Sequence, residues 1–484
     1  MSGKTTQLAR LVIAAPQGRS GKTTVSLGLC AALHGRGLTV QPFKKGPDYI
    51  DPSWLGAAAG RPCRSLEPYF YPTSSGLLSA FIHGSTRADL SLIEGNHGLF
   101  DSSLAADGQE DGQGSTAAVA RILGAPILLV VNTTRMSRSA AAMVAGYQHF
   151  EPDTPLAGVI LNHVAQSRHE EKLRTAIEGY TGLPVVGAIP RQAALQIPDR
   201  HLGLVPHGED PDLHPAIQAC RLAVERYLDL DAILALAHRA SPLPAPDESP
   251  EPTRLETQVR IGVVRDQAFT FYYSENLEAL QEAGAELVEI DALKDPGLPP
   301  IDALIIGGGF PEIFLDQLEG NRSFRQDVRQ AIERGLPVYA ECGGLMYLSQ
   351  AIVWGERRAE MVGVLPYEIE MDSRPQGHGY AEAEVIATNP FFPVGSRLRG
   401  HEFHHSRIHQ LSDQDRSKAY PAYRLLRGAG LNGRRSNGER QGEDGLVIHN
   451  LLASYLHLHA GGSPDWAPGL VRQAQAFART REAA

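Results

Sequence analysis

The sequence predicts two α/β domains connected by a proline-rich linker. Short apolar runs alternate with amphipathic segments in both halves of the 484-residue chain, which is typical of parallel sheets covered by helices. A phosphate-binding pattern follows the first run, and a cysteine with two glycines follows a run in the second half. A chain of this length is too long for one ordinary hydrophobic core. We therefore predict domains at residues 1–236 and 259–484, separated by a linker at residues 237–258.

The apolar runs give the individual elements. In the first half, strands are predicted at residues 11–15, 39–43, 90–93, 126–131, 157–161 and 185–189, with helices at 24–34, 117–123 and 139–148. In the second half, strands are predicted at residues 260–264, 303–306, 337–340 and 446–450. This order favours a parallel-sheet domain with a P-loop, followed by a second α/β domain.

Composition narrows the class of protein. The net charge of −10 argues against a nucleic-acid partner, because phosphate contacts need basic patches. No apolar run approaches the roughly 20 residues of a membrane span, and we expect neither a signal peptide nor a membrane partner. The four cysteines are scattered, so they match neither a disulfide framework nor a zinc pattern. We expect a cytoplasmic protein.

The segment after the first predicted strand has the pattern of a P-loop. Gly21-Lys22-Thr23 follows a strand and opens a helix, where backbone N–H groups bind phosphate oxygens and the threonine reaches Mg²⁺. Pro16 replaces the first glycine of the full pattern, and Gly18 inside the loop partly compensates. The residues predicted to bind ATP here are Gly18, Ser20, Gly21, Lys22, Thr23 and Thr24.

Two acidic segments, at residues 44–52 and 94–101, follow predicted strands of the same sheet. Carboxylates at the carboxyl ends of parallel strands gather over the crevice that the P-loop occupies. Mg²⁺ prefers oxygen ligands and needs few from the protein when phosphates and waters complete its shell. We predict that Thr23, Asp48 and Glu94 are the protein ligands of Mg²⁺.

Cys342 has the surroundings of a nucleophile. It stands between an apolar run and two glycines, a pattern that exposes the sulfur in a tight turn between a strand and a helix. His457, at the end of a later apolar run, is the predicted base that takes the thiol proton and delivers it to leaving ammonia.

The glycines near this thiol are predicted to bind an oxyanion. Gly308 and Gly309 follow the strand at 303–306, and Gly343 follows the cysteine, so their backbone N–H groups are free to approach a tetrahedral intermediate. A carboxamide carbon is the expected target of the thiol. A thiol in one domain and an ATP site in the other indicate two coupled half-reactions.

Residues 401–405 formally match the H-E-x-x-H pattern of zinc proteases. That chemistry needs both histidines on one face of a helix, yet Gly400 and the strand-like surroundings do not favour a helix. We predict a structural or site-facing segment here.

Together and in this order, the motifs resemble the cobyrinic acid a,c-diamide synthase family of glutamine amidotransferases. The resemblance covers nearly the whole chain. It rests on the P-loop segment and on residues 45–52, 94–101, 307–312, 341–347, 400–406 and 453–459.

This resemblance implies a dethiobiotin-synthetase-like ATP-binding domain and a class I glutaminase domain of the Cys-His kind. Such enzymes use Mg-ATP to phosphorylate a peripheral carboxylate of a tetrapyrrole, and ammonia from glutamine converts the acyl phosphate into an amide. Residues of this chain match the family's positions for metal binding and carboxylate activation, namely Lys45, Asp48, Asp51, Glu94 and Asp101. Tyr49 and Ile50 match positions that help to select the side chain of the substrate. Asn162 matches an adenine-binding asparagine, and His459 stands where other class I glutaminases carry a glutamate.

The sequence leaves the substrate and the assembly open. Asn96-His97, Ser102, Arg61-Pro62-Cys63 and residues 134–138 are similar to a branch that is thought to amidate sirohaem, so sirohaem and a corrin precursor are both alternatives. A cobyric acid synthase and a P-loop partitioning ATPase fused to an inactive glutaminase-like module are further alternatives. A homodimer is compatible with the sequence.

Overall fold

The computed structural model describes residues 5–102, 112–192, 195, 199–200, 203–204, 214–244, 258–410, 419–433 and 442–482. The chain divides into two compact units, the N-terminal unit Met1–Ser249 and the C-terminal unit Pro250–Ala484. Within the predicted linker 237–258, the end of α8 (Leu230–His238) and β11 (Leu243–Pro244) are ordered elements. Residues 245–257 lie outside the described part of the chain.

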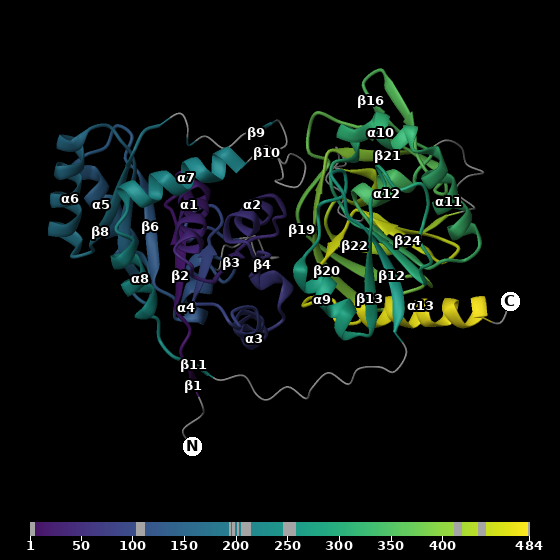
Figure 1. Ribbon diagram of the computed structural model, residues 1–484, viewed down its shortest axis with the longest axis horizontal. Helices are drawn as coiled ribbons and strands as arrows, with labels where there is room; N and C mark the ends of the chain where they lie inside the picture. Colours follow the sequence, from purple (N-terminus) through teal and green to yellow (C-terminus); the bar gives the residue numbers. More distant parts are fainter. Residues whose placement is uncertain are drawn as a thin grey trace. The chain divides into compact units, whose positions relative to one another are not determined.

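The N-terminal unit is built on a seven-stranded parallel sheet (Figure 1). Its strands, in spatial order, are β4 (Arg64–Ser65), β3 (Val40–Lys44), β5 (Leu90–Glu94), β2 (Arg10–Ala14), β6 (Ile127–Asn132), β7 (Leu156–Val164) and β8 (Val185–Pro190). Every strand predicted for this half is present, and each pairing between neighbours is parallel. Two short pairs, β1 (Thr5–Thr6) with β11 and β9 (Asp199–Arg200) with β10 (Gly203–Leu204), lie outside this sheet.

Helices cover both faces of this sheet because its strands are apolar on both sides. Leu11 and Ile13 of β2 belong to one core, while Val12 and Ala14 belong to the other. The first core is completed by α1 (Lys22–Gly35), α2 (Ile50–Ala59), α7 (His214–Tyr227) and α8. The second is completed by α3 (Ser74–Gly84), α4 (Thr116–Leu123), α5 (Arg138–Phe150) and α6 (Ser167–Thr181).

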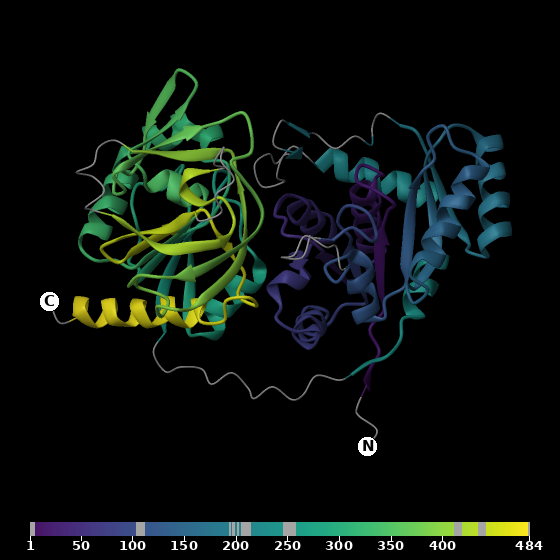
Figure 2. The same cartoon turned by 180° about the vertical axis from the view of Figure 1, so that it is seen from behind.

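The C-terminal unit contains a ten-stranded mixed sheet (Figure 2). Its order is β13 (Ala285–Ile290), β12 (Val259–Val264), β14 (Ala303–Ile306), β15 (Val338–Glu341), β24 (Leu451–Ser454), β23 (Glu443–Ile448), β22 (Tyr420–Arg427), β19 (Gly377–Val385), β20 (Arg397–His404) and β25 (His457–Leu458). A four-stranded sheet joins β17 (Arg357–Glu360), β16 (Ala351–Trp354), β18 (Tyr367–Met371) and β21 (Ser406–Gln410). The strand predicted at 446–450 is wrong in its limits, because the chain turns after Ile448 and residues 451–454 form a separate antiparallel strand.

Alternation along β14 again separates two cores. Leu304 and Ile306 pack with α10 (Leu315–Gly320), α11 (Arg322–Glu333) and α12 (Gly343–Leu348), whereas Ala303 and Ile305 pack with α9 (Ser274–Glu282) and α13 (Trp466–Glu482). The strands from β13 to β24 are parallel, and those from β24 to β25 are antiparallel.

The antiparallel half curls back toward the parallel half. Strand β24 pairs with β15, yet β25 pairs with β20 at the far end of the strand order. Only Tyr455 and Leu456 connect β24 to β25, so β20 must return to the carboxyl end of β15. This curvature brings together residues that are distant in the strand order.

Among the residues that the structure describes, no helix is both long enough and apolar enough to span a bilayer.

Candidate active sites

The P-loop of the N-terminal unit connects the end of β2 to the start of α1. Gly21, directly before α1, has a φ of 95°, a left-handed conformation that favours glycine. Lys22 is buried, and its Nζ donates a hydrogen bond to the carbonyl of His97 at 2.5 Å. Ser20 Oγ donates to the carbonyl of Gln17 at 3.0 Å. The predicted segment therefore has the strand, loop and helix that phosphate binding requires.

Asn162, on β7, supports the P-loop. Its Nδ2 donates to the carbonyl of Ser20 at 2.9 Å, and a Cβ placed on Gly21 would lie 2.1 Å from the same nitrogen. Gly18 lies inside the loop and Thr24 lies in the first turn of α1. The amide of Asn162 thus binds the loop backbone, and its role at the adenine stays a prediction.

A buried lysine joins the acidic residues at the carboxyl ends of β3 and β5. Lys44 Nζ lies 2.5 Å from Asp51 Oδ2, 2.8 Å from Glu94 Oε1 and 3.8 Å from Asp48 Oδ2. The hydroxyl of Thr23 donates to the same Glu94 oxygen at 3.0 Å. One network therefore connects the P-loop to the segment at 44–52.

Burial and charge set the ionisation of this network. Burial favours a neutral Lys44, but the carboxylates of Asp51, Glu94 and Asp48 outweigh it and raise the pKa of Lys44 well above its usual value. Burial, and then the charge of Asp51, raise the pKa of Asp48 to about 7. Burial raises the pKa of Glu94, whereas the pKa of Asp51 is lowered because Lys44 outweighs its burial.

The residues present fit a Mg²⁺ ion beside the P-loop. Glu94 Oε2 is buried and has no hydrogen-bond partner within the described ranges. The Thr23 hydroxyl lies beside the other oxygen of this carboxylate, and paired oxygens of this kind are what Mg²⁺ prefers. Asp48 Oδ1 instead accepts N–H groups of Ile50 at 2.8 Å and Asp51 at 3.3 Å, so its predicted role as a ligand would fall to Oδ2. The part of the chain that the structure describes has no group of three or more acidic, histidine or cysteine residues suited to a metal.

Lys45 is a second buried cation at this edge of the sheet. Its Nζ lies 3.5 Å from Glu67 Oε2, and its backbone N–H donates to the carbonyl of Glu94 at 2.9 Å. Lys44 and Lys45 thus place two cations at the end of β3.

The other predicted substrate residues flank this edge. Tyr49 is buried directly before α2, and Ile50 is the first residue of that helix. Asp101 Oδ2 accepts the N–H of Gly98 at 2.7 Å, which fixes the loop after β5. Their roles in selecting and activating a carboxylate stay predictions.

Cys342 of the C-terminal unit lies in a strained turn between β15 and α12. Its φ of 46° and ψ of −99° are rare for a residue other than glycine. Its N–H donates to the carbonyl of Ser454 at 2.7 Å, and its Sγ donates to the carbonyl of Phe403 at 3.6 Å. Burial, and then the charge of Glu312, raise the pKa of the Cys342 thiol well above its usual value. The thiol therefore needs a nearby base in order to react as a thiolate.

His457 is the first residue of β25 and is fully buried. It pairs with His401 of β20, and the two rings stack with their centroids 4.9 Å apart. The Phe403 carbonyl that accepts from Cys342 belongs to the same strand. The curled sheet thus brings Cys342 and His457 to one short stretch of β20.

The predicted oxyanion glycines lie against these residues. A Cβ on Gly308 would lie 2.4 Å from Cε1 of His457, and a Cβ on Gly343 would lie 3.0 Å from the backbone nitrogen of Gly309. Gly309 has a φ of 155°, and a Cβ there would lie 2.1 Å from the carbonyl oxygen of Ala268. A Cβ at Gly308 or Gly309 would force a neighbouring atom to shift, and one at Gly343 would make a tight contact. The role of these glycines as donors to an oxyanion stays a prediction.

The H-E-x-x-H segment is a strand, as the sequence indicates. His401, Glu402 and His404 lie on β20, so they do not share a helical face. Both carboxylate oxygens of Glu402 accept backbone N–H groups, from Ala429 at 2.7 Å and from Gly430 at 2.8 Å. The same strand carries the Phe403 carbonyl that accepts from Cys342 and the His401 ring that stacks on His457.

Sequence reasoning gave no role to Glu341, although it lies within the cysteine motif. Its Oε2 lies 3.5 Å from Nδ1 of His457. The contact joins residues on β15 and β25 that are far apart in the sequence, and the residue pattern contains no signal for it. The stacking of His401 on His457 was missed for the same reason.

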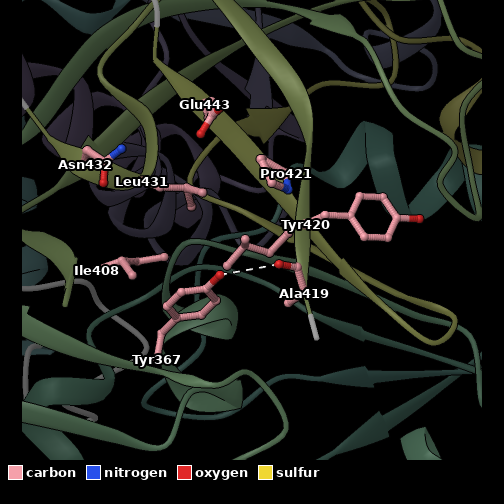
Figure 3. A pocket seen from close by; sticks show the side chains of 9 residues that line it. Tyr367, Ile408, Ala419, Tyr420, Pro421, Leu431, Asn432 and Glu443 are labelled. Atoms are coloured by element: carbon pink, nitrogen blue, oxygen red, sulfur yellow. Dashed lines mark hydrogen bonds between the residues drawn. The ribbon is translucent and has the colours of Figure 1, made fainter. Parts of the chain in front are cut away.

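A separate cavity of about 320 Å³ lies elsewhere in the C-terminal unit (Figure 3). Tyr367, Ile408, Leu431 and Glu443 are among its lining residues, and the Tyr367 hydroxyl donates to the carbonyl of Ala419 at 3.5 Å. None of the predicted site residues lines it.

Comparison with known proteins gives matches along nearly the whole chain. A model of the CobQ/CobB/MinD/ParA nucleotide binding domain matches residues 11–205, and a model of the CobB/CobQ-like glutamine amidotransferase domain matches residues 260–465. The chain is 45% identical over 472 residues to the cobyrinate a,c-diamide synthase of Magnetococcus marinus, covering 96% of this chain and 97% of that protein. It is 41% identical over 467 residues to the cobyrinate a,c-diamide synthase of Archaeoglobus fulgidus, covering 96% and 98% of the two chains. It is 39% identical over 502 residues to that of Methanosarcina acetivorans, covering 98% and 97%.

The contact between Gly308 and His457 generates a testable prediction. In Gly308→Ala, the new methyl group displaces the His457 ring, so we expect the rate of glutamine hydrolysis to fall about 10²-fold, the usual effect of a misplacement near 1 Å. Gly320→Ala is the matched control, because a Cβ on Gly320 meets no atom within 4 Å. Steady-state glutaminase assays of both variants check the prediction, and equal activities would contradict it.

Proposed function

The chain belongs to the cobyrinate a,c-diamide synthase family, and we propose that it amidates the a and c acetate carboxylates of cobyrinate with ATP and glutamine. The observation that carries this proposal is 45% identity over 472 residues to a cobyrinate a,c-diamide synthase, with both domains aligned. The two candidate sites supply the two chemistries that such a reaction needs.

In the first half-reaction, glutamine provides ammonia. His457 accepts the proton of Cys342, and the thiolate attacks the carboxamide carbon of glutamine. Backbone N–H groups of Gly309 and Gly343 stabilise the oxyanion, and His457 returns the proton to the departing ammonia. Water then hydrolyses the thioester and releases glutamate.

In the second half-reaction, a carboxylate of the substrate is activated. A carboxylate resists attack by ammonia, so it first accepts the γ-phosphoryl group of ATP and becomes an acyl phosphate. Lys22, Lys44 and Lys45 offset the repulsion between the two anions as they meet. Bound Mg²⁺, held by Thr23 and Glu94, would neutralise phosphate oxygens in this site. Ammonia then displaces phosphate and leaves an amide.

Among the alternative substrates, the relatives favour cobyrinate. The similar proteins from Magnetococcus marinus, Archaeoglobus fulgidus and Methanosarcina acetivorans are named cobyrinate a,c-diamide synthase, and the alignments cover 97% to 98% of their length. Sirohaem also bears acetate side chains, and the residues Asn96-His97 and Ser102 keep it as the second candidate. We also propose a cytoplasmic location, in keeping with scattered free cysteines and an acidic net charge.

Cys342→Ala separates the two half-reactions. We expect glutamine-dependent amidation and glutamine hydrolysis to be lost, because no other group supplies the nucleophile. Amidation driven by added ammonium chloride continues, because the ATP site is unchanged. Cys220→Ala, a buried cysteine on α7, is the matched control and keeps both activities. Undiminished glutamine hydrolysis in Cys342→Ala would sink the thiol assignment.

The Glu94 carboxylate generates a prediction about metal dependence. In Glu94→Gln, we expect the Mg²⁺ concentration for half-maximal ATP-dependent amidation to rise at least about tenfold, because a charged oxygen ligand is lost. Glu67→Gln makes the same change of charge beside Lys45 and should shift this concentration far less. Titration of Mg²⁺ in ammonia-driven assays measures this concentration for both variants. Equal shifts would reject Glu94 as a ligand of Mg²⁺.

A panel of substrates tests the choice of tetrapyrrole. The wild-type enzyme with Mg-ATP and glutamine is offered cobyrinic acid, hydrogenobyrinic acid or sirohaem, and products are analysed by high-resolution mass spectrometry. We expect cobyrinic acid to be converted to its diamide, because the similar proteins are named cobyrinate a,c-diamide synthase. Mass spectrometry resolves each exchange of OH for NH₂. Conversion of sirohaem alone would reject cobyrinate, and absence of ADP during turnover would reject the acyl phosphate.

A further inference from the structure

The base His457 lacks the usual carboxylate neighbour in the sequence. Class I glutaminases carry a glutamate two residues after the histidine, and His459 stands at that position here. His459 is buried, burial lowers its pKa to about 3, and it is therefore a neutral ring. A neutral ring does not stabilise an imidazolium as a carboxylate does.

Another carboxylate lies beside His457. Glu341 Oε2 lies 3.5 Å from Nδ1 of His457, and both side chains are buried. Its other oxygen, Oε1, accepts the hydroxyl of Tyr339 at 2.9 Å and the N–H of Leu458 at 3.0 Å. Two donors thus fix the carboxylate and direct Oε2 toward the imidazole.

Resting on the proposed glutaminase function, we propose that Glu341 is the positioning residue of His457 and replaces the missing glutamate of the class I arrangement. The residue directly before the nucleophile, rather than one after the histidine, then completes the chain of carboxylate, imidazole and thiol.

The proton movements follow from this arrangement. Nδ1–H of His457 donates to Glu341, which leaves Nε2 to accept the proton of Cys342. The ring then carries a positive charge that Glu341 stabilises, while Glu341 itself takes up no proton. The separation of 3.5 Å is long for a hydrogen bond, and such contacts shorten when the imidazolium forms.

Other titratable groups surround His457 but are engaged differently. Those near it are His401, Glu402 and His404 on β20, Asp444 on β23 and His459, which directly follows β25. Glu402 is bound by the N–H groups of Ala429 and Gly430, and Asp444 by those of Tyr455 and Leu456. Burial keeps the pKa of His401 well below its usual value, so this ring is neutral. Glu275 Oε2 lies 3.9 Å from Nε2 of His459. Glu275 is therefore the alternative to Glu341 as the carboxylate that positions the base.

Glu341→Gln tests the proposal with little change in volume. The amide keeps an oxygen for Tyr339 and Leu458 but places an NH₂ group, which cannot accept, beside Nδ1. We expect the kcat of glutamine hydrolysis to fall by about 10²-fold or more while the KM for glutamine stays close to that of the wild type. Amidation driven by ammonium chloride should keep the wild-type rate, which shows that the N-terminal unit is intact, and the unchanged KM for glutamine shows that the C-terminal unit is folded.

The pH dependence of Cys342 alkylation separates this role from a merely structural one. Iodoacetamide reacts with the thiolate, so its rate against pH reports the coupled thiol and imidazole. Loss of the carboxylate makes the imidazolium less stable, so the ring releases its proton at lower pH, and it also removes a negative charge that raises the pKa of the Cys342 thiol. We therefore expect the inflection to move to lower pH in Glu341→Gln by about one unit or more. Glu275→Gln, the matched control beside His459, should leave the inflection in place.

Three outcomes would overturn the proposal: wild-type kcat in Glu341→Gln, a lowered kcat with an unchanged alkylation profile, or a shift in Glu275→Gln instead. Should Glu341→Gln fail to fold, Glu341→Asp replaces it and should move the inflection in the same direction by less; an unmoved inflection rejects the role. Absence of glutamine hydrolysis in the wild type would instead overturn the proposed function.

Discussion

The edge formed by the carboxyl ends of parallel strands is the constraint on which both candidate sites depend. In the N-terminal unit, β2, β3 and β5 end at one edge and deliver the P-loop, Lys44 and Glu94 to it. In the C-terminal unit, β14 and β15 end beside each other and deliver Gly308 and Cys342. Because backbone hydrogen bonds fix the register of these strands, the distances between functional side chains are set by the sheet itself.

Placing charge at this buried edge is costly unless every charge has a partner. Lys44 loses its hydration but gains Asp51, Glu94 and the more distant Asp48, and this is why it stays protonated. The network leaves one Glu94 oxygen without a hydrogen-bond partner among the described residues. Because Lys44 offsets part of the carboxylate charge, this edge of the sheet suits a divalent cation together with the phosphates that accompany it.

Local patterns in the sequence predicted most of the N-terminal site and about half of the C-terminal one. The P-loop, the strand ends at Lys44 and Glu94 and the turn at Cys342 follow from apolar periodicity and glycine placement, which are local properties. The contacts of His457 depend instead on the return of β20 and β25 to β15. That return arises from the order in which β24, β23, β22, β19, β20 and β25 pair, which no local pattern encodes.

The same curvature explains why a carboxylate next to the nucleophile is a sound place for a positioning residue. Successive residues of a strand point to opposite faces, but the turn at Cys342 changes the backbone direction directly after Glu341. Glu341 therefore stays with β15 and meets β25 from the sheet, while the sulfur points to the carbonyl of Phe403 on β20. Glu341 and Cys342 are consecutive residues, so a shift of the turn at Cys342 moves both groups. The imidazole of His457 is held in place by the pairing of β25 with β20. Leu458, the residue after His457, fixes β25 further, because its N–H donates a hydrogen bond to Glu341.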